Sequence, residues 1–301
     1  MDAHAPTLLA TGIPEVPTTM NLTEELPELP GYRCLKLLGQ GGMGSVYLAE
    51  QHATGRSVAL KLMRPTRAAS AAARSRFLRE MGVMAALRHP RLVEILDAGE
   101  ADGDVYFAME LCEGGSVAEL ARRAGGPLGV EASLAIVLSA LEGLGFAHEQ
   151  RYVHRDLKPE NILLSAEGEL GAKIADFGLA KSFVDAGLSG VTASGTAAGT
   201  FLFMPKEQVV NFKRVGPSTD VWAMAATLYW LLTGKAPRDV REGDNPMSAI
   251  MHRPVVPIRQ RAPHVPAPLA EVIDRALGDA AAARPQHAAE LRALLLDAVE
   301  R

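Results

Sequence analysis

The feature that most constrains the fold is a change of character at Gly114-Gly115. Upstream of this pair, short runs of β-branched and aromatic residues alternate with turn residues, which is typical of strands. Downstream, apolar residues recur at helical spacing over longer segments. The expected strands are 46–49, 58–62 and 105–109, and the expected helices are 71–87, 131–148, 220–232, 269–277 and 287–299. The pattern predicts an α+β fold in which a small sheet lobe, interrupted by one helix, precedes a larger helical lobe.

The N-terminal segment differs from both lobes. Residues 1–30 are rich in proline, threonine and glutamate and show no sustained apolar period. Such a segment cannot bury enough apolar surface to order itself, so we predict a flexible extension. The predicted boundaries are therefore an extension over 1–30, a sheet lobe over 31–111 and a helical lobe over 112–301.

Composition narrows the partners and the compartment. The 301 residues are 48% apolar and carry a formal charge of -4, so no basic field favours nucleic acid or an anionic membrane. The two cysteines, Cys34 and Cys112, provide no disulfide framework, which fits a reducing compartment. The start of the chain lacks the pattern of a secretion signal, and the longest apolar run, 221–232, is shorter than the roughly 20 residues of a membrane helix. We expect a cytoplasmic protein without a membrane segment.

A glycine motif lies at the start of the sheet lobe. Gly39, Gly41 and Gly44 form the pattern G-x-G-x-x-G. A dinucleotide-binding fold needs a helix after the third glycine, whereas residues 46–49 have strand character, so this loop is expected to join two strands. Glycine lets backbone N–H groups approach phosphate oxygens, so the hairpin can fold over a triphosphate. On the motif alone, an ordinary structural turn is an equally good interpretation.

Lys61 ends a buried apolar run and needs an anionic partner there. Glu80, on the helix that follows, is the candidate. A Lys–Glu pair would hold the ammonium towards the phosphates of a bound nucleotide. The alternative is a surface lysine that reaches solvent beside a solvated glutamate.

The segment 154–161 reads His-Arg-Asp-Leu-Lys-Pro-Glu-Asn. With this octapeptide the chain resembles the protein-kinase family, and Asp176-Phe177-Gly178 downstream resembles the family's second metal site. The resemblance covers about residues 31–300 and implies the two-lobed protein-kinase fold. The glycine loop most resembles that of bacterial serine/threonine kinases.

The resemblance assigns roles to these residues. Asp156 would accept or orient the substrate hydroxyl, and Lys158 would stabilise the moving phosphoryl group. Asn161 and Asp176 would hold Mg²⁺ or Mn²⁺, with Lys61 and Glu80 completing the catalytic set. In its lysine two places after the catalytic aspartate, the chain resembles the branch of the family that modifies serine or threonine in proteins.

The resemblance also implies the ATP site. Met109 resembles the gatekeeper, and 110–112 resemble the hinge that holds adenine. The implied ATP-binding residues are Gly39, Gln40, Gly41, Gly42, Gly44, Val46, Ala59, Lys61, Met109, Glu110, Cys112, Ser116 and Leu163.

One departure from the family pattern concerns substrate docking. The activation segment of the family usually ends in Ala-Pro-Glu, but this chain has Pro205-Lys206-Glu207. We expect altered substrate preference with catalysis retained. Glu207 is expected to pair with Arg284, and Thr200 to contact Asp156 and Lys158 in the substrate pocket.

The loop before this segment carries hydroxyl side chains. Arg155 is a cation that a phosphorylated residue could neutralise, and the candidates are Ser189, Thr192, Ser194 and Thr196. We expect activation by autophosphorylation, with self-association for transfer in trans. A constitutively ordered loop is the alternative.

Two rival functions come from other classes. A pseudokinase would keep the fold without the reaction, but such proteins generally lose one of the residues assigned above, and all are present. A small-molecule kinase of related fold would lack the continuation Lys158-Pro159-Glu160-Asn161.

Overall fold

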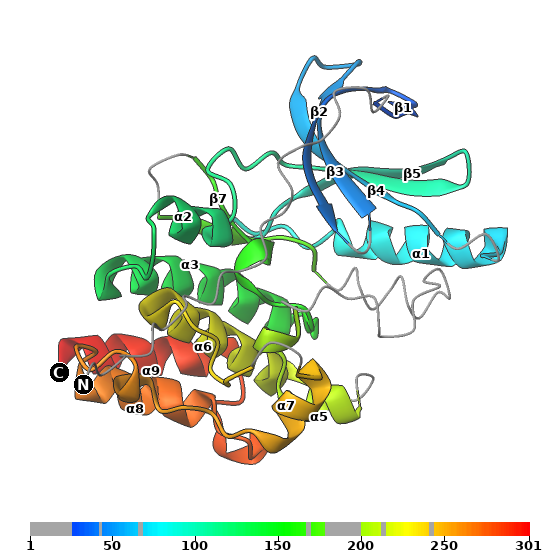
Figure 1. The fold of residues 1–301 in the computed structure, drawn as a ribbon. Coiled ribbons are helices and arrows are strands. Elements are labelled where there is room, and N and C mark those ends of the chain that lie inside the picture. The colour runs from blue at the N-terminus through cyan, green and yellow to red at the C-terminus, as the bar shows by residue number, and fades with distance from the viewer. Residues whose placement is uncertain are drawn as a thin grey trace, which may run out of the picture.

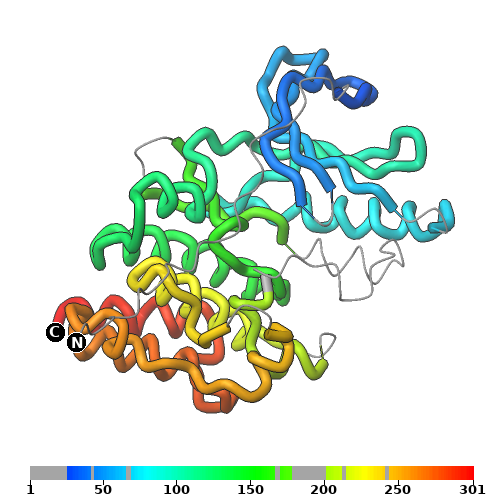
Figure 2. The backbone as a smooth tube through the Cα atoms, in the orientation of Figure 1, coloured from blue at the N-terminus to red at the C-terminus, as the bar shows by residue number. Residues whose placement is uncertain are grey.

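The structure is a computed structural model that describes residues 26–41, 44–65, 69–166, 170–177, 200–211, 215–240 and 244–301. The described residues form a sheet lobe and a helical lobe, and the chain passes from one to the other through residues 110–116 (Figure 1). The smooth backbone trace in Figure 2 shows the same division. The predicted two-lobed α+β architecture is confirmed.

The N-terminal lobe is built on a 6-stranded antiparallel sheet with strand order β1-β2-β3-β4-β6-β5. Its elements are β1 (Glu28–Leu29), β2 (Tyr32–Gly41), β3 (Gly44–Gln51), β4 (Ser57–Met63), α1 (Ala71–Met84), β5 (Ile95–Ala101) and β6 (Asp104–Met109). Strand β4 lies between β3 and β6 and is buried at every position after Ser57. The lysine near its end is therefore enclosed by protein.

The sheet begins earlier than the predicted boundary at residue 31. Leu29 is buried and pairs with Tyr32 across a turn at Gly31, where φ is 81°. Glycine adopts this left-handed conformation without the steric penalty of other residues. Part of the predicted flexible extension is thus a strand, because Leu29 has an apolar cluster to enter.

Helix α1 covers one face of the sheet. The Ser70 hydroxyl caps it by accepting the Ala73 N–H at 3.2 Å, and Phe77 and Met81 are buried against the sheet, where they cluster with residues such as Phe107. The helix was predicted to reach residue 87 but ends at Met84. The N–H groups of Ala86 and Leu87 bond three residues back rather than four, which tightens the chain into a turn.

The C-terminal lobe is mainly helical. Its elements are α2 (Val117–Arg123), α3 (Val130–Glu149), the 3₁₀ turn η1 (Pro159–Asn161), β7 (Ile162–Leu164), β8 (Ala172–Ile174), η3 (Thr200–Phe203), α5 (Lys206–Val210), α6 (Pro217–Thr233), α7 (Pro246–His252), η5 (Ile258–Gln260), α8 (Ala267–Ala276), η6 (Ala281–Ala283) and α9 (Ala288–Glu300). Strands β7 and β8 form a separate two-stranded hairpin. The predicted helices in this lobe are confirmed to within a few residues.

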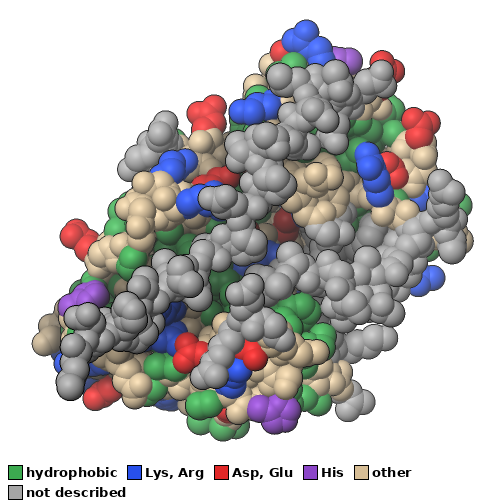
Figure 3. Space-filling view, viewed as in Figure 1, with side chains coloured by type: hydrophobic (Ala, Val, Ile, Leu, Met, Phe, Trp, Pro, Cys, Tyr) green, Lys and Arg blue, Asp and Glu red, His purple; other side chains and the backbone are tan. Residues whose placement is uncertain are grey.

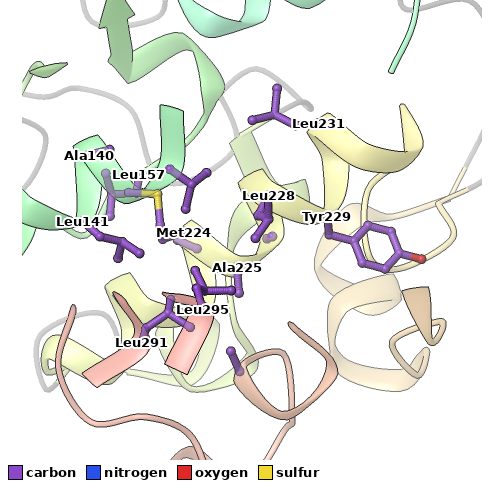
Figure 4. Close-up of a cluster of buried hydrophobic side chains, with 14 of the residues drawn as sticks. Ala140, Leu141, Leu157, Met224, Ala225, Leu228, Tyr229, Leu231, Leu291 and Leu295 are labelled. Atoms are coloured by element: carbon purple, nitrogen blue, oxygen red, sulfur yellow. The ribbon is translucent and has the colours of Figure 1, made fainter. Parts of the chain in front are cut away.

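Helix α6 is the centre of this lobe. Met224 and Ala225 of α6 lie between Leu141 of α3 and Leu295 of α9 (Figure 4). The long apolar run 221–232 is buried except for a partly exposed Trp230, so its interpretation as a core helix is confirmed. A rigid α6 can therefore hold neighbouring loops in place.

Within the described ranges, α3 is long and apolar enough to cross a membrane. Core helices of globular domains pass the same test, and α3 packs against α6, α9 and β8. On the face drawn in Figure 3, acidic and basic side chains are interspersed, in keeping with the small net charge.

Candidate active site

A buried carboxylate organises the loop around residue 156. Asp220, in the first turn of α6, is 0% exposed and accepts the N–H groups of His154 at 2.7 Å and Arg155 at 2.8 Å. Its Oδ2 also lies 3.0 Å from Nε2 of His148. A carboxylate that accepts several hydrogen bonds is well satisfied in the interior. The loop backbone is thereby fixed to the most buried helix of the lobe.

His154 links this loop to the segment that contains Asp176. Its Nδ1 lies 3.2 Å from the Asp156 N–H, so Nδ1 accepts and Nε2 donates to the Ala175 carbonyl at 2.8 Å. Its ring also packs edge-on against Phe177, with ring centroids 4.7 Å apart. This ring contact joins the catalytic loop to the segment that follows β8.

Asp156 lies between two donors. Nδ2 of Asn161 donates to the Asp156 carbonyl at 2.7 Å and to its Oδ2 at 3.2 Å, and Nζ of Lys158 lies 3.3 Å from the same Oδ2. These contacts fix the carboxylate and stabilise its charge. The structure thus brings together three residues of the octapeptide.

Lys61 and Asp176 meet across the two lobes. Nζ of Lys61, on the buried strand β4, forms an ion pair with Oδ2 of Asp176. Asp176 has a φ of 59°, a conformation uncommon for a residue other than glycine, and this turn brings it beneath the sheet lobe. Lys61 is only 9% exposed, so its charged ammonium needs an anionic partner.

The predicted Lys61–Glu80 pair is not among the ion pairs of the described residues, so that contact was wrong for this conformation. Glu80 is half-buried on α1, and Lys61 is paired with Asp176 instead. Which of two carboxylates an ammonium meets depends on the position of α1, which local sequence does not fix.

Asp176 and Asn161 are suited to a divalent cation. Oδ1 of Asp176 is buried and has no hydrogen-bond partner within the described parts of the chain. Asn161 uses Nδ2 as a donor, which leaves its Oδ1 as a ligand. Mg²⁺ prefers oxygen ligands and typically takes one or two from protein and the rest from phosphates and water. The same ranges hold no group of three His, Cys, Asp or Glu side chains that could bind a metal alone, so this site would be shared with a nucleotide.

The glycine motif forms the hairpin between β2 and β3, with Gly41 paired to Gly44, so the expected strand–loop–strand arrangement is confirmed. A Cβ at Gly44 would lie 2.0 Å from the Leu62 carbonyl oxygen, whereas a Cβ at Gly39 or Gly41 would meet nothing within 4 Å. Packing therefore requires only the third glycine. Gly42, which was assigned to ATP, lies outside the described residues.

The predicted adenine-binding residues lie where the lobes join. Ala59 of β4 pairs with the buried Met109 of β6, and Val46 of β3 pairs with Lys61. Leu163 of β7 forms an isolated bridge with Ser116. The hydroxyl of Ser116 caps α2, so an ATP contact through it remains a prediction. A cavity beside Met109 is lined by Met84 of α1, Ile95 of β5, Phe177 and Asp176, among others.

The hinge carries an ion pair that the sequence did not indicate. Glu110 donates its backbone N–H to the Glu94 carbonyl at 2.9 Å, and its carboxylate pairs with Lys173 of β8. Burial, followed by the nearby Glu110 charge, raises the pKa of Cys112 to about 11, although Lys173 opposes the rise. The thiol of Cys112, within the hinge, is therefore protonated and uncharged at ordinary pH.

The segment after Thr200 is held by ion pairs. The predicted pair is present: two guanidinium nitrogens of the buried Arg284 lie 2.5 and 3.1 Å from the Glu207 carboxylate oxygens. Lys206 lies 2.6 Å from Asp279, which also binds Arg238 at 2.6 Å. Burial alone would raise the pKa of Asp279, but the bonds from Lys206 and Arg238 lower it.

The contacts of Lys206 bear on the departure from the family pattern at this position. Its ammonium is paired with Asp279, on the segment after α8. The expected contact of Thr200 with Asp156 and Lys158 stays a prediction. Ser189, Thr192, Ser194 and Thr196 lie outside the described residues.

Comparison with known proteins agrees with this geometry. The sequence matches the family model described as protein kinase domain over residues 32–293. Serine/threonine-protein kinase pkn2 of Myxococcus xanthus is 35% identical over 264 residues, which cover 86% of this chain and 31% of the relative. Serine/threonine-protein kinase PknB of Mycobacterium tuberculosis is 35% identical over 272 residues, which cover 88% of this chain and 42% of the relative. The chain thus spans about a third to two fifths of the length of these relatives.

Solved structures are also similar. The PknI kinase domain of Mycobacterium tuberculosis aligns with a TM-score of 0.69 and 28% identity, covering 93% of this chain and 100% of that one. Rad53 1-466 in complex with AMP-PNP aligns with a TM-score of 0.72 and 25% identity, covering 88% and 65%. With the family model matched over most of its length and the motif residues gathered between two lobes, this chain belongs to the protein kinase family.

Proposed function

We propose that this chain is a serine/threonine protein kinase that transfers the γ-phosphate of ATP to protein hydroxyl groups. The observation that carries the proposal is the convergence of Lys61 from one lobe with Asp156, Asn161 and Asp176 from the other. Phosphoryl transfer needs little covalent chemistry from the protein, because positioning and charge neutralisation supply most of the catalysis. A lysine, two carboxylates and an amide between two lobes meet that need.

The roles follow from the contacts. Asp156, fixed by Asn161 and Lys158, would accept a hydrogen bond from the substrate hydroxyl and align it with the phosphate. Lys61 would bind phosphate oxygens once a nucleotide competes for its ammonium. Asn161 and Asp176 would hold Mg²⁺, which supplies neutralisation of phosphate charge when bound. Lys158, whose Nζ lies 3.3 Å from Oδ2 of Asp156, would contact the transferred group.

The choice of serine or threonine rests on Lys158 and on the relatives, whose names describe serine/threonine-protein kinases. The substrates and partners of the whole protein belong to the same proposal, because the chain spans only part of these relatives. Regulation by phosphorylation at Ser189, Thr192, Ser194 or Thr196, self-association and a cytoplasmic location are further parts of it.

Transfer of label from γ-³²P-ATP to a basic protein tests the proposal. We expect Mg²⁺-dependent labelling of serine or threonine by the parent. Lys61→Met and Asp156→Asn should lower the rate roughly 10²- to 10³-fold, since each removes a group that acts on the transferred phosphate. Equal labelling by the variants would refute the assigned roles, and a parent that binds ATP without labelling any protein would support the pseudokinase alternative.

A further inference from the structure

Gln208 joins the end of the activation segment to the catalytic loop. It lies in α5, is 4% exposed, and its Nε2 donates to the Arg155 carbonyl at 2.6 Å. Its own backbone N–H bonds to the Pro205 carbonyl at 3.1 Å. The neighbouring Glu207 is fixed by Arg284, so the amide is delivered from an anchored helix.

The residue that receives this bond is in an unfavourable backbone conformation. Arg155 has a φ of 69°, in the left-handed region, where a Cβ lies too close to the backbone. Its N–H is held by Oδ1 of Asp220 at 2.8 Å and its C=O by Gln208. Two separate helices, α6 and α5, therefore hold the two polar backbone groups of this one residue.

The bond from Gln208 bears directly on Asp156. The Arg155 carbonyl and the Asp156 N–H belong to the same planar peptide group. That N–H lies 3.2 Å from Nδ1 of His154, so both polar atoms of the peptide have partners. The orientation of this peptide sets the direction in which the Asp156 side chain leaves the backbone.

We propose that Gln208 is a positioning residue that holds the 155–156 peptide so that Asp156 faces the substrate hydroxyl, an inference that rests on the proposed kinase function. Without the amide donor, the Arg155 carbonyl loses its bond to Gln208, and the bond from the Arg155 N–H to Asp220 no longer has this counterpart on the other side of the residue. The peptide can then rotate towards an ordinary backbone conformation. Asp156 moves with it, whereas the ATP-binding strands do not.

Gln208→Met and Gln208→Glu test the proposal. Methionine keeps the length of the side chain without a donor, and an ionised glutamate turns an acceptor towards the carbonyl. We expect kcat to fall on the order of tenfold in Gln208→Met and further in Gln208→Glu, because small displacements of a catalytic group are costly. The KM for ATP is expected to stay at the parent value, since the hydrogen bonds of Gln208 among the described residues go to Arg155 and Pro205 and not to a predicted ATP-binding residue.

Two control variants separate positioning from general loss of stability. Gln260→Met makes the same change at an exposed glutamine, and Ile273→Val removes one methyl group from the buried core of α8 and so lowers stability. Both should keep the parent kcat while they are folded. An unchanged kcat in Gln208→Met, or a fall in Ile273→Val that matches it at equal loss of thermal stability, would overturn the proposal.

Amide hydrogen exchange at Asp156, measured by NMR, gives a readout that needs no turnover. Gln208→Met should speed this exchange while leaving the amides of α9 protected, and Gln260→Met should not. If the parent transfers no phosphate, the proposed function fails while this measurement still decides whether Gln208 holds the loop. Unchanged exchange in Gln208→Met would show that it does not.

Discussion

At the scale of single residues, Asp220 has the largest structural role in the site. Its carboxylate accepts the N–H groups of His154 and Arg155 and contacts His148; the bonds to the two histidines are buried and the bond to Arg155 is partly buried. In Asp220→Asn one oxygen becomes an NH₂ group, which cannot accept from a backbone N–H. We expect the free energy of unfolding to fall by about 1–3 kcal/mol, the cost of an unsatisfied buried polar group, together with a loss of kinase activity.

Chemical denaturation of Asp220→Asn measures this change. Asp102→Asn is the matched control, because Asp102 is exposed and has a positive φ of 53° that asparagine also tolerates. Its midpoint should equal that of the parent. A midpoint of Asp220→Asn that also equals the parent's would contradict the role of the carboxylate.

Residues in local motifs were predictable, and their distant partners were not. Asp156 and Asn161 lie within one short segment, so their proximity follows from the chain itself. Gln208 is 53 positions from Arg155, and no local signal marks a single glutamine in a short helix. The partner of Lys61 was mispredicted for the same reason, since Asp176 is 115 positions away.

At the scale of elements, helix α5 shows how a departure from a family pattern is accommodated. Lys206 begins the helix and is paired with Asp279, which also binds Arg238. The sequence reveals the substitution at Lys206 but not its compensation, because the partners come from segments that only the folded chain brings together. The expected effect on substrate preference therefore has to act through neighbours of Lys206 rather than through a free ammonium.

The hairpin of β2 and β3 leads to a prediction about two of its glycines. Gly44 has a φ of 148° and no room for a Cβ, whereas Gly41 has open space. Gly44→Ala should therefore lower the free energy of unfolding of the sheet lobe by about 2–4 kcal/mol, through backbone strain and a clash with Leu62. Gly41→Ala should leave stability unchanged and raise the KM for ATP, because the added methyl stands where phosphate would approach.

Thermal unfolding and ATP kinetics distinguish the two glycine variants. A Gly41→Ala variant with the parent's KM would show that the first part of the loop does not approach the nucleotide. A Gly44→Ala variant as stable as the parent would contradict the close packing against Leu62.

At the scale of the whole molecule, the lobes are connected in more than one place. The loop after α1 joins the C-terminal lobe, because Val93 donates to the Ile174 carbonyl and Ile174 to the Arg91 carbonyl, each at 2.9 Å. On the hinge side, Glu110 pairs with Lys173. The two-lobed architecture followed from the change in sequence periodicity. These connections did not, because they join segments far apart in the chain.

Binding of a nucleotide with its metal should therefore stabilise the molecule as a unit. Among the described residues, Oδ1 of Asp176 is buried without a hydrogen-bond partner and would be a ligand of Mg²⁺, while Oδ2 pairs with Lys61 of the other lobe. A ligand at 100 times its Kd adds about 2.7 kcal/mol to the free energy of unfolding, which raises the midpoint temperature measurably. We expect Mg²⁺ to increase the stabilisation by ATP in the parent and in Asp156→Asn, but not in Asp176→Asn. Since each variant is compared with its own ligand-free form, loss of the Lys61 ion pair does not obscure the result, and an Mg²⁺-dependent increase that persists in Asp176→Asn would place the metal elsewhere.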